Sequence, residues 1–335
     1  MIDTALYSKC GVCGSAFKAE ILMAEERMLG YQEKFEYARC GNCDCLQLTN
    51  PPASMTKYYP SNYYAFNSVP DLQENDPFPF RRRFLYFSIT AARLGWPSTI
   101  GSFLRRLGSG PFIPNSMSML ARPLHARSPI LDVGCGNGRE LFSYRLCGFT
   151  NLLGIDPYLQ NELDRGSEFQ LQKKELSQVE GKFDLIMFHH VYEHLQDPLG
   201  TLELAKSLLN PGGQILIRIP LSDSETARKY GAKWVQLDAP RHFFLHTRKS
   251  MNVLAEKCGM KVVNVVYDSE GFQFLGSELY QRSDMSLSEF YSDYARNYAK
   301  FFKPGEDVAF QKHAFELNSR NAGDQAGFCL VKVNE

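Results

Sequence analysis

The feature that most constrains the fold is a short apolar run that ends in a glycine turn, Ile130-Leu131-Asp132-Val133-Gly134-Cys135-Gly136-Asn137-Gly138. A strand that ends in such a turn and continues into a helix predicts an α/β unit whose ligand approaches the main chain closely, because glycine permits positive φ and has no Cβ. The spacing is GxGxG, and its third glycine comes one position earlier than in the GxGxxG turn of dinucleotide sites. The turn therefore predicts a ligand that has no pyrophosphate.

The chain divides into three regions by pattern: 1–50, which is rich in cysteine; 51–127, a linker rich in Arg and aromatic residues with short helices; and 128–335. In the third region apolar runs alternate with helix patterns, which predicts a mostly parallel sheet with helices on both faces. Asp197 with Pro198 predicts a helix start, and Thr247 predicts another. A helical insertion is expected at about 270–325, before the last strand. The predicted strands are Ile130–Val133, Leu152–Ile155, Phe183–Phe188, Gln214–Ile219, Lys261–Val266 and Phe328–Val333.

The first region contains two CxxC pairs, Cys10 with Cys13 and Cys40 with Cys43, on either side of a predicted β-hairpin (Phe17–Leu22 and Lys34–Ala38). Two such turns can place four thiolates tetrahedrally around one Zn²⁺ and leave no position for a catalytic water. The pattern therefore predicts a structural zinc ribbon, with a redox pair or an iron centre as the alternatives. Cys45 is expected to be a packed thiol.

Four segments of the third region, LDVGCGNG, GIDP, FDLIMFHHVYEHLQDP and LNPGGQILIRIP, resemble the successive motifs of class I S-adenosylmethionine-dependent methyltransferases. The resemblance implies a Rossmann-like fold with a seven-stranded, mostly parallel sheet whose last strand is antiparallel. Together with KYYPSNYYAF, the cysteine region resembles the zinc-ribbon methyltransferases of bacterial polysaccharide and deoxysugar biosynthesis. An enzyme that uses S-adenosylmethionine and carries zinc is the resulting expectation.

Several residues are expected to bind this cofactor. Asp156 follows the second strand, where an acid can accept hydrogen bonds from both ribose hydroxyls. Asp132 is expected to face the cationic amino-acid end of the cofactor, and His189 directly follows the predicted strand Phe183–Phe188 and is expected beside the cofactor. The complete set of predicted cofactor-binding residues is Asp132, Gly134, Cys135, Gly136, Asp156, Glu175, Leu176 and His189.

The predicted catalytic residues are His242, Tyr192 and His194. They lie in the connections that follow the predicted strands Phe183–Phe188 and Gln214–Ile219, where a base can act on an acceptor hydroxyl. In sugar C-methyltransferases that this chain resembles, a histidine corresponding to His242 is the base. Here Pro240 and Arg241 precede His242 and depart from that pattern, which leaves O-methylation open. Packing beside the cofactor is the alternative role for His194, and a lid is the alternative role for His242.

The formal net charge is zero, yet eight arginines and no Asp, Glu or Lys lie between Pro77 and Leu131. We expect this segment, with Arg81, Arg82 and Arg83, to face the same cleft as His242 and to bind an anionic saccharide acceptor that is nucleotide-linked or lipid-linked. Nucleic acid is disfavoured by the overall neutrality. The alternatives are a ribosomal RNA base methyltransferase with a zinc module and a non-catalytic cofactor-binding protein.

No apolar run is long enough to span a bilayer, and the first residues lack the pattern of a secretory signal. A cytoplasmic protein is therefore expected. Peripheral contact with a membrane through residues 77–131 is left open, since an arginine-rich and aromatic surface suits anionic lipid.

Overall fold

The computed structural model describes residues 9–60, 80–100, 103, 113–159, 161–166 and 168–333. Its strands are β1 Phe17–Glu25, β2 Lys34–Cys40, β3 Leu46–Leu48, β4 Ile130–Val133, β5 Leu152–Ile155, β6 Leu163–Asp164, β7 Phe169–Gln172, β8 Phe183–His189, β9 Leu209–Pro220, β10 Phe244–Leu245, β11 Met260–Tyr267 and β12 Gln325–Lys332. Its helices are α1 Phe80–Arg93, α3 Asn115–Ser118, α4 Arg139–Leu146, α5 Pro198–Ser207, α6 Glu225–Tyr230, α7 Arg248–Lys257, α8 Phe272–Arg282, α9 Leu287–Ser292, α10 Tyr294–Phe301 and α11 Glu306–Ser319. Short 3₁₀ turns are η2 Thr56–Tyr58, η5 Leu176–Gln178, η6 Tyr192–His194, η7 Gly231–Lys233 and η8 Val235–Leu237.

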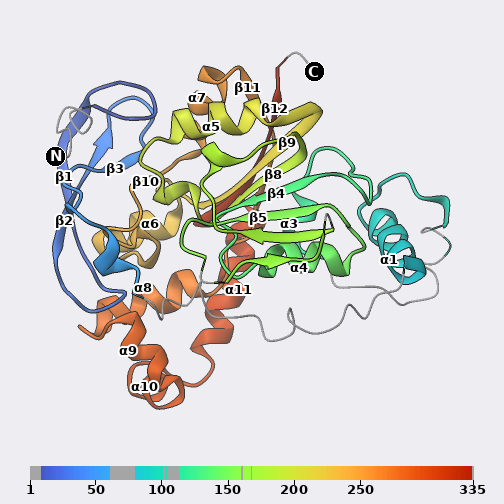
Figure 1. The fold of residues 1–335 in the computed structure, drawn as a ribbon. Helices are drawn as coiled ribbons and strands as arrows, with labels where there is room; N and C mark the ends of the chain where they lie inside the picture. The colour runs from blue at the N-terminus through green and yellow to red at the C-terminus, as the bar shows by residue number, and fades with distance from the viewer. Residues whose placement is uncertain are drawn as a thin grey trace.

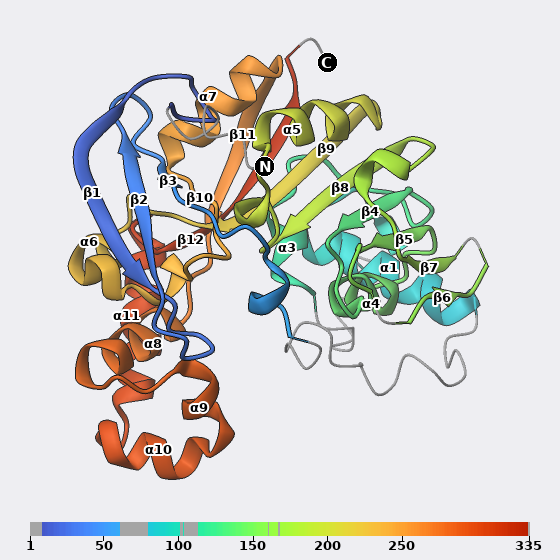
Figure 2. The ribbon, with the colours of Figure 1, turned by 60° about the vertical axis from the view of Figure 1, so that its left-hand side comes forward.

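The centre of the molecule is an eight-stranded sheet in the order β11-β12-β9-β8-β4-β5-β7-β6, whose strands spread across Figure 2. Strands β9, β8, β4, β5 and β7 run parallel, whereas β12 is antiparallel to both β9 and β11. This arrangement confirms the predicted Rossmann-like methyltransferase fold with an antiparallel last strand. The strand beyond the predicted seven is β6, which spans two residues and pairs with β7 at the edge.

The parallel strands lie in the core because their sequences are apolar on both faces. All four residues of β4 are buried, and in β8 only Asp184 and His189 are partly exposed. Both predicted helix starts are confirmed: the side chain of Asp197 accepts a hydrogen bond from Gly200 N, and the side chain of Thr247 accepts one from Ser250 N. These caps fix the starts of α5 and α7, which pack against β9 and β11 respectively.

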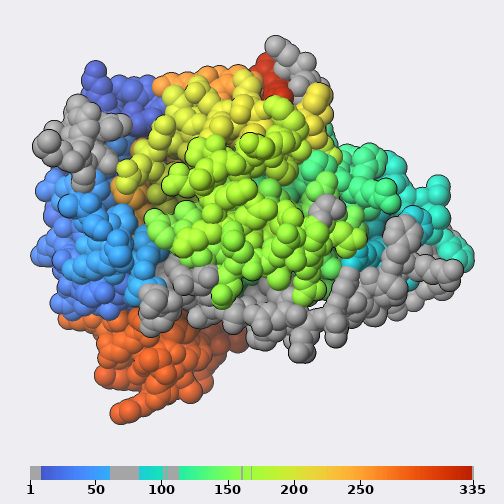
Figure 3. Space-filling view, viewed as in Figure 1, coloured from blue at the N-terminus to red at the C-terminus, as the bar shows by residue number. Residues whose placement is uncertain are grey.

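A second sheet joins the N-terminal region to the rest of the chain. Its order is β1-β2-β3-β10, in which Phe244 and Leu245 of β10 pair with Gln47 and Leu46 of β3. The first three strands belong to the cysteine-rich region, and β10 lies two residues after His242. The N-terminal sheet (blue) covers one flank of the molecule, with the helices α9 and α10 (orange) below it (Figures 1 and 3). The ribbon is therefore part of the same packed structure as the loop that carries His242.

The described part of the arginine-rich segment lies on the opposite flank. Helix α1 packs beside the turn that follows α4, and both Figure 1 and Figure 2 place it on the far side of the sheet from β10. Arg83 Nη1 lies 2.5 Å from Glu168 Oε2. The side chains of Arg81 and Arg82 are outside the described residues, so the shared cleft with His242 remains a prediction. Among the residues described, no helix is both long and apolar enough to cross a bilayer.

Candidate functional site

The glycine turn after β4 meets the end of β5 through backbone and carboxylate hydrogen bonds. The N–H groups of Gly134 and Cys135 donate to Ile155 O at 2.8 and 3.0 Å. Gly136 N donates to Asp156 Oδ2 at 3.1 Å, and the other carboxylate oxygen of Asp156 accepts from Tyr158 N at 2.8 Å. These bonds hold Asp156 at the carboxyl edge of the parallel strands, where ligands of such sheets bind.

The glycines of this turn are required by space as well as by φ. Gly134 has a φ of +70°, and a Cβ there would lie 2.4 Å from Val191 Cγ2. Gly138, with a φ of +76°, begins α4 and would place a Cβ 2.7 Å from Leu171 Cδ1. The turn therefore packs too closely against Val191 and Leu171 to hold side chains at these positions.

The two carboxyl groups beside this turn, Asp132 and Asp156, differ in their hydrogen bonding. Asp132 is buried, and its Oδ1 has no hydrogen-bond partner among the described residues. Burial, with further contributions from Glu140 and Asp156, raises the pKa of Asp132 well above its ordinary value. Burial also raises the pKa of Asp156, against the two backbone hydrogen bonds that lower it. A buried acceptor without a partner is costly, so Asp132 fits a ligand that donates to it.

The other predicted cofactor-binding residues surround the same edge. His189 ends β8, and burial lowers its pKa to about 3; its Nε2 lies 3.9 Å from Glu140 Oε1. Glu175 caps η5, whose first residue Leu176 is buried. Cys135 packs under the turn, where a Cβ on Gly154 would be 2.8 Å from its sulfur. Their contact with a cofactor stays a prediction, but the residues present fit S-adenosylmethionine.

A second group of polar side chains follows His189 along the same connection. One ligand atom from each of Glu193, His194 and His242 lies within 4.8 Å of the other two, and we call these three residues the histidine–glutamate cluster. The two imidazole rings meet edge to face with centroids 4.6 Å apart. The tertiary structure thus brings together two of the three predicted catalytic residues, from loops that are far apart in sequence.

The charge on Glu193 is set by its neighbours. Its side chain is fully buried, which by itself would raise its pKa, but His190, His194 and His242 lower that pKa to about 2. Burial lowers the pKa of His194 to about 4. Near pH 7 the cluster therefore combines an anionic carboxylate with a neutral His194.

Tyr192, the third predicted catalytic residue, is placed differently. It is fully buried, and its hydroxyl donates to the carbonyl of Pro198 at the start of α5. Burial raises the pKa of this phenol well above its ordinary value. Its observed contact anchors the start of α5.

The ribbon holds the loop that carries His242. Tyr37 Oη donates to His242 O at 2.8 Å, and Leu48 N donates to Phe243 O at 2.9 Å. The fully buried Arg241 pairs with Asp238 and lies 3.9 Å from Glu26, a residue of the ribbon. Tyr37 and Glu26 were not predicted from the sequence. Their partners lie about two hundred residues away, and contacts at such a distance produce no local sequence pattern.

Tyr59 also escaped the sequence analysis, although it lies in the quoted segment KYYPSNYYAF. Its ring stacks on Tyr158, two residues after Asp156, with centroids 5.8 Å apart. Its hydroxyl lies 3.1 Å from His194 Nδ1. We call the glycine turn together with Asp132 and Asp156 the cofactor edge. Tyr59 therefore connects the cofactor edge to the histidine–glutamate cluster.

The four cysteines predicted to bind metal converge. Cys10, Cys13, Cys40 and Cys43 place their sulfurs within 4.8 Å of one another, with 3.3 Å between the sulfurs of Cys13 and Cys40. This set suits Zn²⁺, and four thiolates would complete its shell. Cys45 stands apart: it is buried and its thiol donates to Leu245 O at 3.4 Å.

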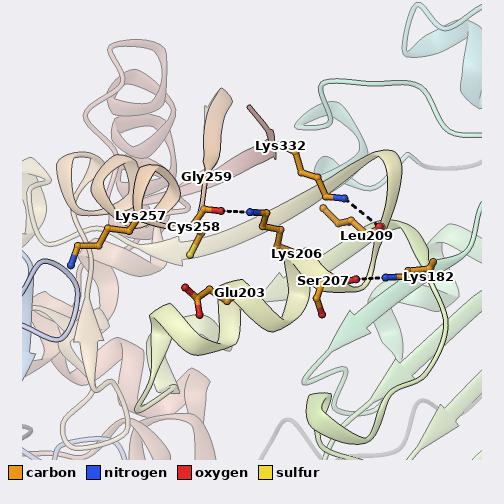
Figure 4. Close-up of a pocket in the computed structure, with 9 residues that line it drawn as sticks. All are labelled: Lys182, Glu203, Lys206, Ser207, Leu209, Lys257, Cys258, Gly259 and Lys332. Atoms are coloured by element: carbon orange, nitrogen blue, oxygen red, sulfur yellow. Dashed lines mark hydrogen bonds between the residues drawn. The ribbon is translucent and has the colours of Figure 1, made fainter. Parts of the chain in front are cut away.

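A basic hollow of about 590 Å³ lies at the opposite edge of the central sheet, near the starts of β8 and β9 (Figure 4). We call it the lysine hollow, because it contains Lys182, Lys206, Lys257 and Lys332 and the single acid Glu203. Lys206 Nζ donates to Cys258 O at 2.7 Å, and Lys182 Nζ donates to Ser207 O. These carbonyls terminate helices, where a cation is stabilised. The hollow is thus a cationic surface that is separate from the glycine turn.

The fold and the geometry at the glycine turn define a class I S-adenosylmethionine-dependent methyltransferase domain. In agreement, residues 111–265 match the sequence model of a family described as "Methyltransferase domain". This part of the chain is therefore a methyltransferase domain.

Curated relatives among the matches are named as transfer RNA enzymes. The tRNA U34 carboxymethyltransferase of Idiomarina loihiensis is 27% identical over 160 residues, which cover 41% of this chain and 46% of that protein. The enzyme of the same name from Campylobacter fetus is 24% identical over 175 residues, covering 49% and 58%. The chain thus spans about half the length of these relatives.

Solved structures are similar only in part. The cyclopropane synthase MmaA2 from Mycobacterium tuberculosis is 13% identical with a TM-score of 0.42, over 77% of this chain and all of that one. Phosphoethanolamine N-methyltransferase 2 of Haemonchus contortus is 17% identical with a TM-score of 0.39, over 76% and 57%.

The predicted saccharide acceptor is wrong, and so is the prediction that disfavoured nucleic acid. The relatives are named for tRNA modification, which agrees with the RNA alternative and gives no support to a role in polysaccharide biosynthesis. The net charge of zero, from which nucleic acid was disfavoured, is a sum over the whole chain. Such a sum does not report a local cationic surface such as the lysine hollow.

Proposed function

We propose that this protein transfers a methyl group, or a substituted methyl group such as carboxymethyl, from a sulfonium cofactor to a transfer RNA. The observation that carries the cofactor half of the proposal is the unpartnered Oδ1 of Asp132 beside the Asp156 carboxylate, which is fixed by Gly136 N. Both acids lie at the carboxyl edge of β4 and β5, which run parallel. The sulfonium cofactor supplies an electrophilic carbon when it is bound.

The residues of the turn would bind and orient this cofactor. Asp156 would accept hydrogen bonds from ribose hydroxyls, since each carboxylate oxygen has a second lone-pair site beyond the one used by Gly136 N or Tyr158 N. Asp132 would accept from the ammonium group of the amino-acid end, which removes the cost of its buried unpartnered oxygen. Glu175 and Leu176 would border the adenine, and His189 would lie beside the cofactor at the end of β8.

The proposal of an RNA acceptor is supported by the names of the relatives and by charge. The lysine hollow has four ammonium groups against one carboxylate, and an ammonium that donates once to a helix carbonyl keeps two further N–H donors. Phosphates of an RNA backbone would be attracted to such a surface. The uridine at position 34 is the first acceptor base to test.

The histidine–glutamate cluster would receive the acceptor nucleotide. It follows His189 on the same connection, and Tyr59 joins it to the cofactor edge through Tyr158 and His194. Aromatic faces such as those of Tyr59 and Tyr158 are surfaces on which bases stack. Tyr158 is 55% exposed, so part of this surface is open to solvent.

The test is a side-by-side transfer assay with the full chain. Methyl-labelled and carboxymethyl-labelled forms of the cofactor are each offered with unmodified total tRNA, ribosomal RNA and a nucleotide sugar. We expect label in tRNA alone, and nucleoside digestion with mass spectrometry would identify the modified base. Label confined to ribosomal RNA or to the sugar would overturn the proposal, whereas label on another tRNA base would overturn only the uridine.

The lysine hollow has its own test. Lys257→Gln removes one cation from this surface, so we expect a higher KM for tRNA, an unchanged kcat and a salt dependence of binding that is weaker by about one unit of slope. Lys300→Gln, at an exposed lysine of α10, is the matched control. Equal salt slopes for both variants would remove the hollow from the RNA surface.

A further inference from the structure

The histidine–glutamate cluster has a hydrogen-bonding pattern that a methyltransferase does not need for its cofactor. His242 Nδ1 lies 2.8 Å from Gln236 O, and His194 Nδ1 lies 2.9 Å from Arg241 O. A carbonyl oxygen can only accept, so each Nδ1 must carry the proton. When such a ring is neutral, its Nε2 carries no hydrogen and has a lone pair that can accept a hydrogen bond or bind a cation.

The third member of the cluster offers only acceptors as well. Glu193 has an exposed fraction of 0%, and neither of its carboxylate oxygens has a hydrogen-bond partner within the part of the chain that the structure describes. Its Oε1 lies 3.3 Å from His190 Nδ1 and 4.0 Å from His242 Nε2. A buried carboxylate without a partner is strongly destabilising unless a cation compensates it.

The histidines around Glu193 favour its charged form, whereas the nearby arginines pair with other acids. Arg241, the nearby buried cation, is engaged by Asp238 through its Nε at 2.9 Å and through Nη2. Arg218 is likewise engaged by Asp268, at 2.6 Å, and donates to His190 Nε2 at 2.7 Å. This second contact fixes the His190 tautomer, so that His190 supports the cluster from outside.

We propose that Glu193, His194 and His242 form a second metal site, distinct from the cysteine cluster, for a divalent first-row transition cation. Imidazole and carboxylate ligands together suit Zn²⁺, Fe²⁺ or Co²⁺ rather than an oxygen-seeking ion such as Ca²⁺. A ligating histidine commonly donates its other ring N–H to a backbone carbonyl, which is the arrangement of both histidines here.

The separation of one ligand pair is close to the one that a shared metal ion requires. Two ligand bonds of about 2.1 Å can span at most about 4.2 Å, and His242 Nε2 lies 4.0 Å from Glu193 Oε1. A contraction of about half an ångström would bring this pair to a tetrahedral separation, and one of about 1 Å to an octahedral separation. Three protein ligands leave at least one position for water or an acceptor oxygen, and the use of that position by RNA rests on the proposed function.

The experiment adds Co²⁺ to the full chain after its cysteine cluster has been loaded with Zn²⁺. We expect one Co²⁺ to bind per chain, with the weak absorption bands of nitrogen and oxygen ligands and without the intense sulfur-to-metal charge-transfer bands. X-ray absorption at the cobalt edge should show imidazole scattering and no sulfur. Because this measurement uses the wild-type protein, its outcome does not depend on whether a variant folds.

Variants assign the ligands. In His242→Gln and Glu193→Gln we expect Co²⁺ affinity to fall by more than the about 10–100-fold that follows loss of an outer-shell partner, while the zinc of the cysteine cluster is retained. His125→Gln, at an exposed histidine outside the cluster, should bind Co²⁺ as the wild type does. Circular dichroism would confirm the folding of each variant.

The proposal is overturned if the zinc-loaded protein takes up no Co²⁺, if the cobalt has sulfur ligands, or if both folded variants bind it with wild-type affinity. None of these measurements uses RNA. Failure of the metal site therefore leaves the proposed transfer to tRNA standing, and a bound Co²⁺ without RNA labelling would overturn that transfer alone.

Discussion

The cofactor edge and the histidine–glutamate cluster are neighbours in the fold but are built in different ways. The cofactor edge comes from two short segments, in which the backbone of Gly136 binds Asp156 twenty residues later. The cluster combines η6 with a loop about fifty residues further on, and this loop is held by Tyr37 of the ribbon, 205 residues from His242. A change in the ribbon should therefore affect the cluster and leave the cofactor edge nearly intact.

Loss of the ribbon metal is expected to have the largest effect and tests this contrast directly. Cys40→Ser removes one of four converging thiols, and structural zinc contributes about 10–16 kcal/mol to the folding of small zinc modules. We expect loss of zinc, a lower melting temperature and loss of transfer activity, with cofactor affinity changed by less than about threefold. Metal analysis, thermal melting and calorimetry with S-adenosylmethionine are the measurements.

The control for this experiment is Cys147→Ser, at a buried thiol far from the cysteine cluster. It should retain zinc and activity. A Cys40→Ser protein that loses cofactor binding and activity together would show that the two regions depend equally on the ribbon.

His242→Gln is expected to show the next largest effect. A base contributes about 10²–10⁴-fold to a rate, and a metal ligand at this position would also act on the acceptor. We expect kcat to fall by about this factor while the Kd for S-adenosylmethionine is unchanged, measured by steady-state kinetics and calorimetry. Full activity of this variant would exclude His242 as a base and would leave a lid as its role.

Asp156→Ala is expected to change the cofactor edge and to leave the histidine–glutamate cluster intact. The ribose hydroxyls would lose their acceptor, so we expect S-adenosylmethionine binding to weaken by about 1–3 kcal/mol. Asp284→Ala is the matched control, because that side chain is 92% exposed. Unchanged calorimetric affinity in a folded Asp156→Ala protein would place the ribose contact elsewhere, and lost metal binding in the cluster would contradict the independence of the two regions.

Tyr37→Phe removes only the hydroxyl that donates to the carbonyl of His242 and should have the smallest effect. The carbonyl is left buried without this donor, so we expect a loss of about 1–3 kcal/mol in the free energy of unfolding, measured by urea titration. A several-fold lower kcat with an unchanged cofactor Kd should accompany it. If kcat is unaffected, the ribbon supports the stability of this loop but not its geometry.

The central fold could be predicted to a large extent because its elements are short and strongly patterned. The predicted bounds of β4 and β5 agree with the structure residue for residue, and the caps Asp197 and Thr247 are where the sequence placed them. Strand β7 was missed, because its sequence FQLQ alternates buried and partly exposed residues and lacks a continuous apolar run. A strand near the edge of a sheet needs only one apolar face.

The amino-acid sequence by itself determined the glycine turn, Asp132 and Asp156 and the two cysteine pairs, because each depends on residues a few positions apart or on a repeated spacing. Only the tertiary structure decided that His194 and His242 meet at Glu193 and that the Nδ1 atom of each ring binds a backbone carbonyl. It also decided that β3 of the ribbon pairs with β10 beside His242. Contacts between distant segments arise from the packing of whole elements, and that packing leaves no local pattern in the chain.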